Sequence, residues 1–133
     1  MYIKLTAIRE RRDPMFAMFN RNTAPQMSPA EAVQKSAAGE IVLVDIRDGM
    51  ELQYGGKAKG AIHVPMAALA MKADPRSPEC LEVFKSGKPI AVYCASGARS
   101  SMAKRMLANM GYDDVHNIGG LGHWQMAGGE IER

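Results

Sequence analysis

Apolar and polar residues follow two different periods along the chain, and the changes of period separate strands from helices. Two runs, residues 41–47 (IVLVDIR) and 88–94 (KPIAVYC), are nearly continuously apolar and rich in β-branched residues. Such runs are typical of strands that are buried on both faces of a parallel sheet. Shorter strands are predicted at 61–65 (AIHVP) and within 112–120 (YDDVHNIGG).

Helical patterns fill the segments between these strands. Ser28 is a preferred N-cap residue, Glu31 follows three positions later, and Gly39 lies just past the apolar pattern, so a first helix is predicted over 29–38. Further helical stretches, the last of them a turn or a helix, are predicted within 48–56, 66–74, 77–87, 100–111 and 121–128.

Strands that alternate with helices predict an α/β domain with a mainly parallel central sheet and helices on both faces. The length of 133 residues suits one domain, which we place at residues 28–133 after an N-terminal extension, residues 1–27. In sheets of this kind, binding sites lie beyond the carboxyl ends of the strands. Asp45, Arg47 and Cys94 stand at such ends.

The net positive charge of the chain lies in the extension. The extension holds five basic and two acidic residues and so accounts for the net charge of +3, whereas residues 28–133 hold 12 of each sign. A basic segment can contact acidic partners, nucleic acid or anionic lipid, but a solvated terminal segment needs none of them. We expect no nucleic-acid partner. The 47% of hydrophobic and 23% of charged residues are ordinary for a globular domain.

The cysteine content indicates a reducing compartment. Cys80 and Cys94 are too few for a disulfide framework. The N-terminal residues lack the continuous apolar stretch of a secretory signal. No segment approaches the roughly 20 apolar residues of a membrane-spanning helix. We therefore expect a cytoplasmic protein.

The segment VYCASGARSS, residues 92–101, is the strongest candidate for chemistry. Cys94 ends a predicted strand, residues 95–99 are expected to form a tight loop, and a helix should begin near Ser100. The thiol has three interpretations: a reactive thiolate, an inert buried group, or a neighbour of an anion site. Small side chains and Gly97 let backbone N–H groups converge, and a helix N-terminus adds further donors. These donors favour a thiolate nucleophile at Cys94, while Cys80 is expected to be inert.

The same segment resembles the active-site loop of the rhodanese sulfurtransferases, whose pattern is Cys, two variable residues, Gly, one variable residue, Arg, Ser. Cys94, Gly97, Arg99 and Ser100 occupy these positions. The resemblance covers about residues 28–133 and implies a rhodanese-like single domain. It is carried by three further segments and one position: VLVDIRD (42–48), GAIHVP (60–65), NIGGLGHWQMAG (117–128) and Glu51.

This resemblance implies a sulfurtransferase in which Cys94 takes the outer sulfur of a donor such as thiosulfate as a persulfide. Cyanide, a thiol or an acceptor protein would then remove that sulfur. No metal and no organic cofactor would be required, and the oligomeric state is left open. Arg99 would either contact the anionic donor or hold the loop by pairing with Glu51 or Asp45. The implied substrate-binding residues are Ala95, Ser96, Gly97, Ala98, Arg99 and Ser100, with Asp45, Arg47 and Glu51 in support.

Two other function classes are weighed against this one. Rhodanese-like domains also serve as binding or regulatory modules or as persulfide relay partners, but such modules often lack the cysteine that this chain keeps. Phosphatases and arsenate reductases resemble the family but insert one more residue between Cys and Arg. Here four residues separate Cys94 from Arg99, so the smaller loop should suit a persulfide better than a phosphate.

One segment departs from the family pattern. Where relatives commonly carry Gly-His-Ile-Pro-Gly-Ala, this chain has GKAKGA at 56–61. Lys57 and Lys59 are expected to be solvated, with attraction of an anionic substrate as the alternative. His63, His116 and His123 have no spacing that indicates a metal site or a catalytic triad, and Trp124 is expected to pack near the site.

Overall fold

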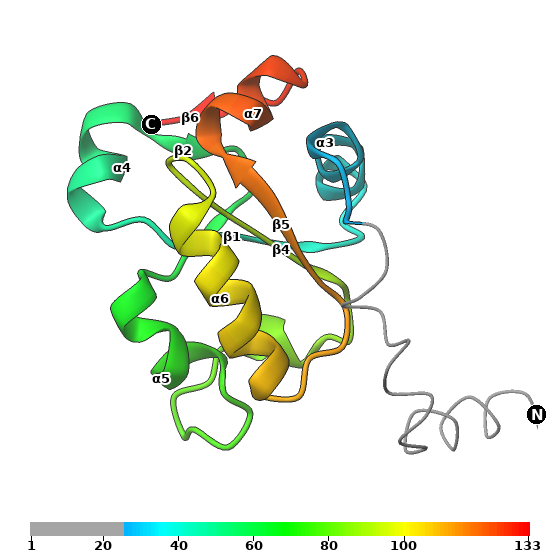
Figure 1. Ribbon diagram of the computed structural model, residues 1–133, viewed down its shortest axis with the longest axis vertical. Coiled ribbons are helices and arrows are strands. Elements are labelled where there is room, and N and C mark those ends of the chain that lie inside the picture. The colour runs from blue at the N-terminus through cyan, green and yellow to red at the C-terminus, as the bar shows by residue number, and fades with distance from the viewer. Residues whose placement is uncertain (1–25) are drawn as a thin grey trace, which may run out of the picture.

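The structure is a computed structural model that describes residues 26–133. Its centre is a four-stranded parallel sheet in the order β3-β1-β4-β5, of which β1, β4 and β5 are labelled in Figure 1. The predicted α/β class with a mainly parallel sheet is thereby confirmed. The strands are β1 (Val42–Asp45), β3 (Ile62–His63), β4 (Ile90–Cys94) and β5 (Val115–Gly120).

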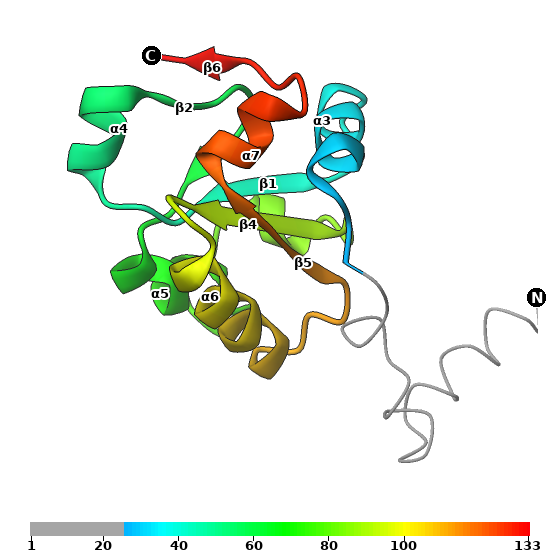
Figure 2. The same cartoon turned by 45° about the horizontal axis from the view of Figure 1, so that its top comes forward.

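Helices cover both faces of this sheet, as the sequence predicts. Figure 2 shows α3 (Pro29–Ala37) and α7 (Leu121–Met126) on one side, and α5 (Leu69–Ala73) and α6 (Ala98–Asn109) on the other. The short helix α4 (Gly49–Gly55) follows β1 at the carboxyl end of the sheet. None of the helices within residues 26–133 has the length and apolar character needed to cross a bilayer.

The central strand β4 is buried on both faces, because its side chains alternate between two apolar clusters. Ile90, Val92 and Cys94 belong to the cluster beneath α5 and α6, whereas Ala91 and Tyr93 belong to the cluster beneath α3 and α7. The last two residues of the strand therefore point to opposite sides of the sheet. This alternation decides which groups can surround the thiol.

The start of α3 forms the reciprocal cap that the sequence predicts. The Ser28 hydroxyl accepts a hydrogen bond from the Glu31 backbone N–H at 3.1 Å, and the Glu31 carboxylate accepts one from the Ser28 N–H at 2.8 Å. The predicted extension, 1–27, lies outside the described residues except for its last two. Met27 is buried and Gln26 accepts a hydrogen bond from Asn117, so both pack on the domain.

Two predicted helices differ in the structure. The segment 66–74 divides into the 3-10 helix η2 (Met66–Ala68) and α5. The predicted helix at 77–87 is wrong: a turn leads into the 3-10 helix η3 (Glu82–Lys85). The Ser77 hydroxyl accepts from the Glu79 N–H, two residues ahead, instead of capping a full helical turn. The Ser-Pro sequence therefore closes a turn.

A second, two-stranded sheet was not predicted from the sequence. Strands β2 (Lys57–Ala58) and β6 (Ile131–Glu132) pair antiparallel. Lys57 forms an ion pair with Glu132 at 2.9 Å and has only 25% of its side chain exposed, so its expected solvation is wrong. Lys59 is 67% exposed, as expected, and pairs with Glu130 at 3.2 Å. Carboxylates thus balance the charge of both lysines.

Candidate active site

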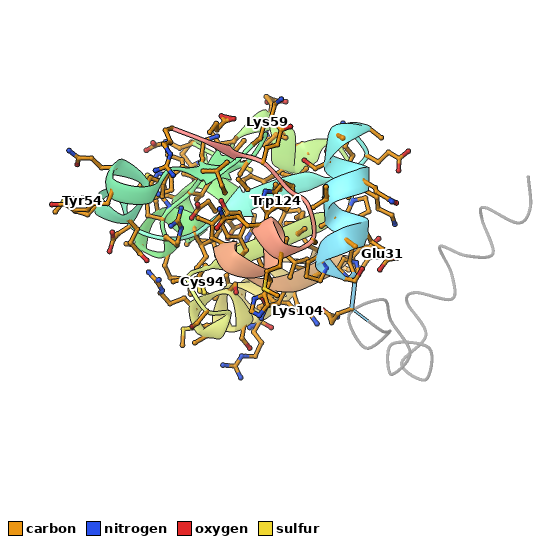
Figure 3. All side chains as sticks on the ribbon, turned by 90° about the horizontal axis from the view of Figure 1, so that it is seen from above. Glu31, Tyr54, Lys59, Cys94, Lys104 and Trp124 are labelled. Atoms are coloured by element: carbon orange, nitrogen blue, oxygen red, sulfur yellow. The ribbon has the colours of Figure 1, made fainter. Side chains whose placement is uncertain are left out.

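Cys94 is the last residue of β4, and the loop that follows it comprises only residues 95–97. Figure 3 shows Cys94 beside the start of α6. The helix begins at Ala98, two residues before the expected start at Ser100, so the loop is shorter than the predicted 95–99. Gly97 has a φ of 107°, a left-handed conformation that suits glycine and lets the chain turn directly into the helix.

Hydrogen-bond donors surround the Cys94 sulfur. Its Sγ accepts from the Gly97 N–H at 3.0 Å, from the Ser100 N–H at 3.4 Å, and lies 3.4 Å from the Ser100 hydroxyl. The side chain is buried, with the residue only 1% exposed. The sulfur is therefore held among polar hydrogens where the β4 strand meets the first turn of α6.

These donors make the thiol acidic. Burial alone would raise the pKa of Cys94, since it disfavours the charged form. Hydrogen bonds from the Ser100 hydroxyl and from the N–H groups of Ser100, Gly97 and Ser96 outweigh burial and lower the pKa from 9.0 to about 7. The thiolate is therefore well populated near neutral pH.

The end of β5 presses against this loop and requires glycine there. A Cβ placed on Gly120 would come 2.7 Å from the Ala95 carbonyl carbon, which is closer than real Cβ contacts. A Cβ on Gly97 would come 3.3 Å from the Gly119 Cα. The two glycines that end β5 therefore let the Cys94 loop pack directly on its neighbouring strand.

Arg99 joins the loop to α4. Its Nη1 and Nη2 donate to Oε1 and Oε2 of Glu51 at 2.7 and 2.9 Å, a bidentate ion pair. The Arg99 hydrogen bonds, helped by the N–H of the Asp48 cap, lower the pKa of Glu51 to about 2. Of the two partners considered from the sequence, Arg99 pairs with Glu51 and not with Asp45. Its side chain remains 41% exposed.

Asp45 and Arg47 form a separate buried network. The Asp45 carboxylate is fully buried and accepts from the Arg47 Nε and Nη2 and, at 2.6 Å, from the Tyr93 hydroxyl. Arg47 also donates to the Gly56 carbonyl at 2.6 Å, and the Tyr93 hydroxyl accepts from the Ala58 N–H at 2.9 Å. Because the Tyr93 side chain lies on the face of the sheet opposite the Cys94 sulfur, this network lies on that face as well. Its hydrogen bonds connect β1 and β4 with β2.

Two residues of the site were missed in the sequence. Tyr93 lies in a buried strand, and a buried tyrosine hydroxyl needs a polar partner, which could have pointed to Asp45. Asn117 accepts from the Ser100 hydroxyl at 2.7 Å and donates from Nδ2 to the Gly97 carbonyl at 3.1 Å. Its only sequence signal is an amide two positions before the glycine pair that ends β5.

The histidines have ordinary partners. His63 Nε2 contacts the Arg47 carbonyl at 2.7 Å, and His123 Nδ1 accepts from the Gly120 N–H at 2.9 Å. His116 Nδ1 accepts from the Met27 N–H, so its Nε2 carries the proton that faces Asp114. Within residues 26–133, no three metal-ligating side chains come together.

Trp124 and Cys80 both pack away from the hydrogen bonds of the thiol. Trp124 is buried in the cluster beneath α3 and α7, and its indole N–H donates to the Glu130 carbonyl at 2.8 Å. Its expected packing is confirmed, but its expected place near the site is not, because Cys94 belongs to the cluster on the other face of the sheet. Cys80 is partly exposed and packs against the cluster beneath α5 and α6.

Comparison with known proteins places this geometry in a family. A model of the rhodanese-like domain matches residues 28–127. Thiosulfate sulfurtransferase GlpE of Actinobacillus succinogenes is 30% identical over 108 residues, which cover 80% of this chain and 89% of that protein. Thiosulfate sulfurtransferase PspE of Escherichia coli is 35% identical over 78 residues, which cover 59% of this chain and 68% of that protein. A solved Rhodopseudomonas palustris structure, described as of unknown function and a possible tyrosine phosphatase, has 37% identity and a TM-score of 0.73 over 84% of this chain and 86% of that chain. The chain belongs to the rhodanese-like domain family.

Proposed function

We propose that this chain is a sulfurtransferase that carries a sulfane sulfur on Cys94. The observation that supports it best is the buried Sγ, which accepts hydrogen bonds from Gly97 and Ser100 and has a pKa of about 7. The relatives named thiosulfate sulfurtransferase support the same activity. Because this thiol acts only while reduced, a cytoplasmic location is part of the proposal.

Loading begins with the thiolate. The Cys94 sulfur attacks the outer sulfur of thiosulfate, and a new S–S bond forms while the S–S bond of thiosulfate breaks. The electron pair of the broken bond leaves with sulfite, so no external oxidant or reductant is needed. No proton has to be removed from Cys94 once it is a thiolate, and a dedicated general base is therefore unnecessary.

Unloading is a second displacement. The thiolate of a small thiol or of an acceptor protein, or cyanide, attacks the terminal sulfur of the Cys94 persulfide. The Cys94 thiolate leaves, and the products are an acceptor persulfide or thiocyanate. In both steps the leaving or attacking Cys94 sulfur is an anion, which the Gly97 and Ser100 donors stabilise.

The loop and the start of α6, residues 95–100, would bind the donor. Ala95, Ser96 and Ala98 contribute backbone and little bulk. The exposed part of the Arg99 guanidinium can face the anionic group of the donor while its ion pair with Glu51 holds the side chain. Arg99 would thus combine the two roles that the sequence left open.

A phosphatase is the second candidate, since one similar structure is described as a possible tyrosine phosphatase. The family's phosphatases place one more residue between Cys and Arg, whereas Cys94 and Arg99 are separated by four. The shorter loop favours a single sulfur atom over a tetrahedral phosphate. A binding module without catalysis would not need an acidic thiol at Cys94.

Intact-protein mass spectrometry after incubation with thiosulfate tests the proposal. We expect one added sulfur atom, released as thiocyanate when cyanide follows. Cys94→Ser should abolish the adduct, and the control Cys80→Ser should retain it. An adduct that survives Cys94→Ser but is lost in Cys80→Ser would contradict the assignment. Hydrolysis of a small aryl phosphate without any sulfur adduct would favour the phosphatase.

A further inference from the structure

The Ser100 hydroxyl has more acceptors than protons. Its Oγ lies 2.7 Å from Asn117 Oδ1, 3.4 Å from Cys94 Sγ and 3.4 Å from the Gly119 carbonyl oxygen. A hydroxyl donates one hydrogen bond at a time. The shortest of the three contacts is the one to Asn117, so the hydroxyl cannot serve the sulfur without leaving the amide.

The orientation of the Asn117 amide is fixed by groups that can act in one way only. The Gly97 carbonyl can only accept, so it takes Nδ2 at 3.1 Å. The Gly119 N–H can only donate, so it faces Oδ1 at 2.9 Å. Asn117 Oδ1 therefore always points to Ser100. It also keeps the Gly119 N–H as a partner when the Ser100 proton turns away.

These contacts allow two arrangements of protons. In the neutral state, the Cys94 thiol donates to Ser100 Oγ, and Ser100 donates to Asn117, which forms an unbroken chain. In the charged state, the Ser100 hydroxyl turns and donates to the Cys94 sulfur. The first arrangement stabilises the thiol and the second stabilises the thiolate, so an acceptor at position 117 favours the neutral form.

We propose that Asn117 is a positioning residue that competes with Cys94 for the Ser100 proton and thereby sets the acidity and reactivity of the thiol. The effect of this competition on sulfur transfer rests on the proposed function, in which the Cys94 thiolate attacks the sulfur donor. The competition itself does not depend on which substrate Cys94 uses.

Charged and titratable groups on the neighbouring elements are left in place when Asn117 is replaced. Arg99 on α6 carries a cation that interacts with the Cys94 charge, and Glu51 pairs with Arg99 from α4. His123 on α7 is held by the Gly120 N–H. The remaining such groups on these elements and on the adjoining strands are Asp45 on β1, Arg47 after it, Asp48 before α4, Tyr54 on α4, Tyr93 on β4, Lys104 and Arg105 on α6 and His116 on β5.

The test is the pH dependence of Cys94 alkylation by iodoacetamide in the Cys80→Ser background, where Cys94 is the one reactive thiol. Asn117→Leu keeps the branched shape and the number of side-chain heavy atoms but removes the acceptor, together with the contact to the Gly97 carbonyl, so we expect its midpoint to fall by about half a pH unit. Asn117→Asp offers a stronger acceptor and adds a negative charge, so its midpoint should rise by about one pH unit.

Both substitutions are repeated with Ser100→Ala, which removes the contested proton. The Asn117→Leu shift should then vanish, and the Asn117→Asp shift should shrink to the part that the added charge causes. A folded Asn117→Leu protein whose midpoint is unchanged or raised overturns the proposal. If Asn117→Leu fails to fold, the Asn117→Asp pair decides: equal shifts with and without Ser100→Ala overturn the proposal as well.

Failure of this inference can be told apart from failure of the proposed function, because alkylation needs no sulfur donor. The expected shifts in a protein that takes no sulfur from thiosulfate would support the competition and contradict the sulfurtransferase. Sulfur loading of Cys94 without a Ser100-dependent shift of the alkylation midpoint would support the sulfurtransferase and contradict the competition.

Discussion

Asp45 and Arg47 offer the sharpest test of whether the residues beside the site are framework. Asp45 and the Arg47 side chain are 0% and 6% exposed and form a bidentate pair, closed by the Tyr93 hydroxyl. We consider three variants: Asp45→Leu, Arg47→Met and both together. Each single change leaves one charge buried without its partner, whereas the double change removes both charges.

The burial of this pair sets the expected size of the effect. Removing one member of a buried ion pair costs about 3–5 kcal/mol of unfolding free energy, because the other charge stays desolvated. For a domain of this size, that corresponds to a fall of about 10–20 °C in melting temperature. The double variant should be more stable than the sum of the two single losses implies, by about 2 kcal/mol or more.

The chain contains its own control. Asp74 and Arg76 have the same spacing, and Arg76 donates from N, Nε and Nη2 to the Asp74 carboxylate as Arg47 does to Asp45. The Arg76 side chain, however, is 85% exposed. The same three substitutions there should change stability only slightly, because water replaces the lost partner.

Urea unfolding followed by tryptophan fluorescence measures the free energy of unfolding for both sets of variants. The buried structural pair would be refuted if the losses of unfolding free energy in Asp45→Leu and Arg47→Met simply added up in the double variant. It would also be refuted if these losses were as small as those at Asp74 and Arg76. A stable Asp45→Leu protein that has lost sulfur loading would refute it as well, since that result would move Asp45 from the framework into the chemistry.

Two further predictions concern the loop and its ion pair. Gly120→Ala should displace the Cys94 loop and slow its alkylation, while Gly122→Ala, with nothing within 4 Å of the added Cβ, should not; equal rates would refute the packing argument. Glu51 has its pKa lowered from 4.5 to about 2 in the folded state, so its stabilising effect is complete above 4.5 and is lost as the pH falls to about 2. The stability difference between the natural chain and Glu51→Gln should therefore narrow through this window, and a difference independent of pH would contradict the ion pair.

The sheet could be predicted because its strands carry a local signal. Residues 41–47 and 88–94 are nearly continuously apolar and rich in β-branched residues, a pattern typical of strands covered on both faces. The helix α3 was equally clear, since its cap uses residues three positions apart. Cys94, Gly97 and Ser100 were found for the same reason, because the strand, turn and helix that bring them together are contiguous.

Most of the features that were missed depend on distant residues. The turn at Ser77 is an exception: it has the same Ser-Pro start as α3, but Cys80 stands where α3 has Glu31, so the reciprocal cap cannot form. The β2–β6 pair joins segments that are more than 70 positions apart, such as Lys57 and Glu132. Asn117 on β5 reaches Ser100 on α6, 17 positions earlier in the chain, a contact that no local pattern contains.

The proposed chemistry depends most directly on the acidity of the Cys94 thiol. Alkylation of Cys94 by limiting iodoacetamide across a range of pH, in the otherwise natural chain with Cys80→Ser, measures that acidity. We expect a single midpoint at a pH of about 7, because the donors of Gly97 and Ser100 stabilise the thiolate. A midpoint at or above the ordinary value of 9.0 would show that these donors do not make the thiol acidic.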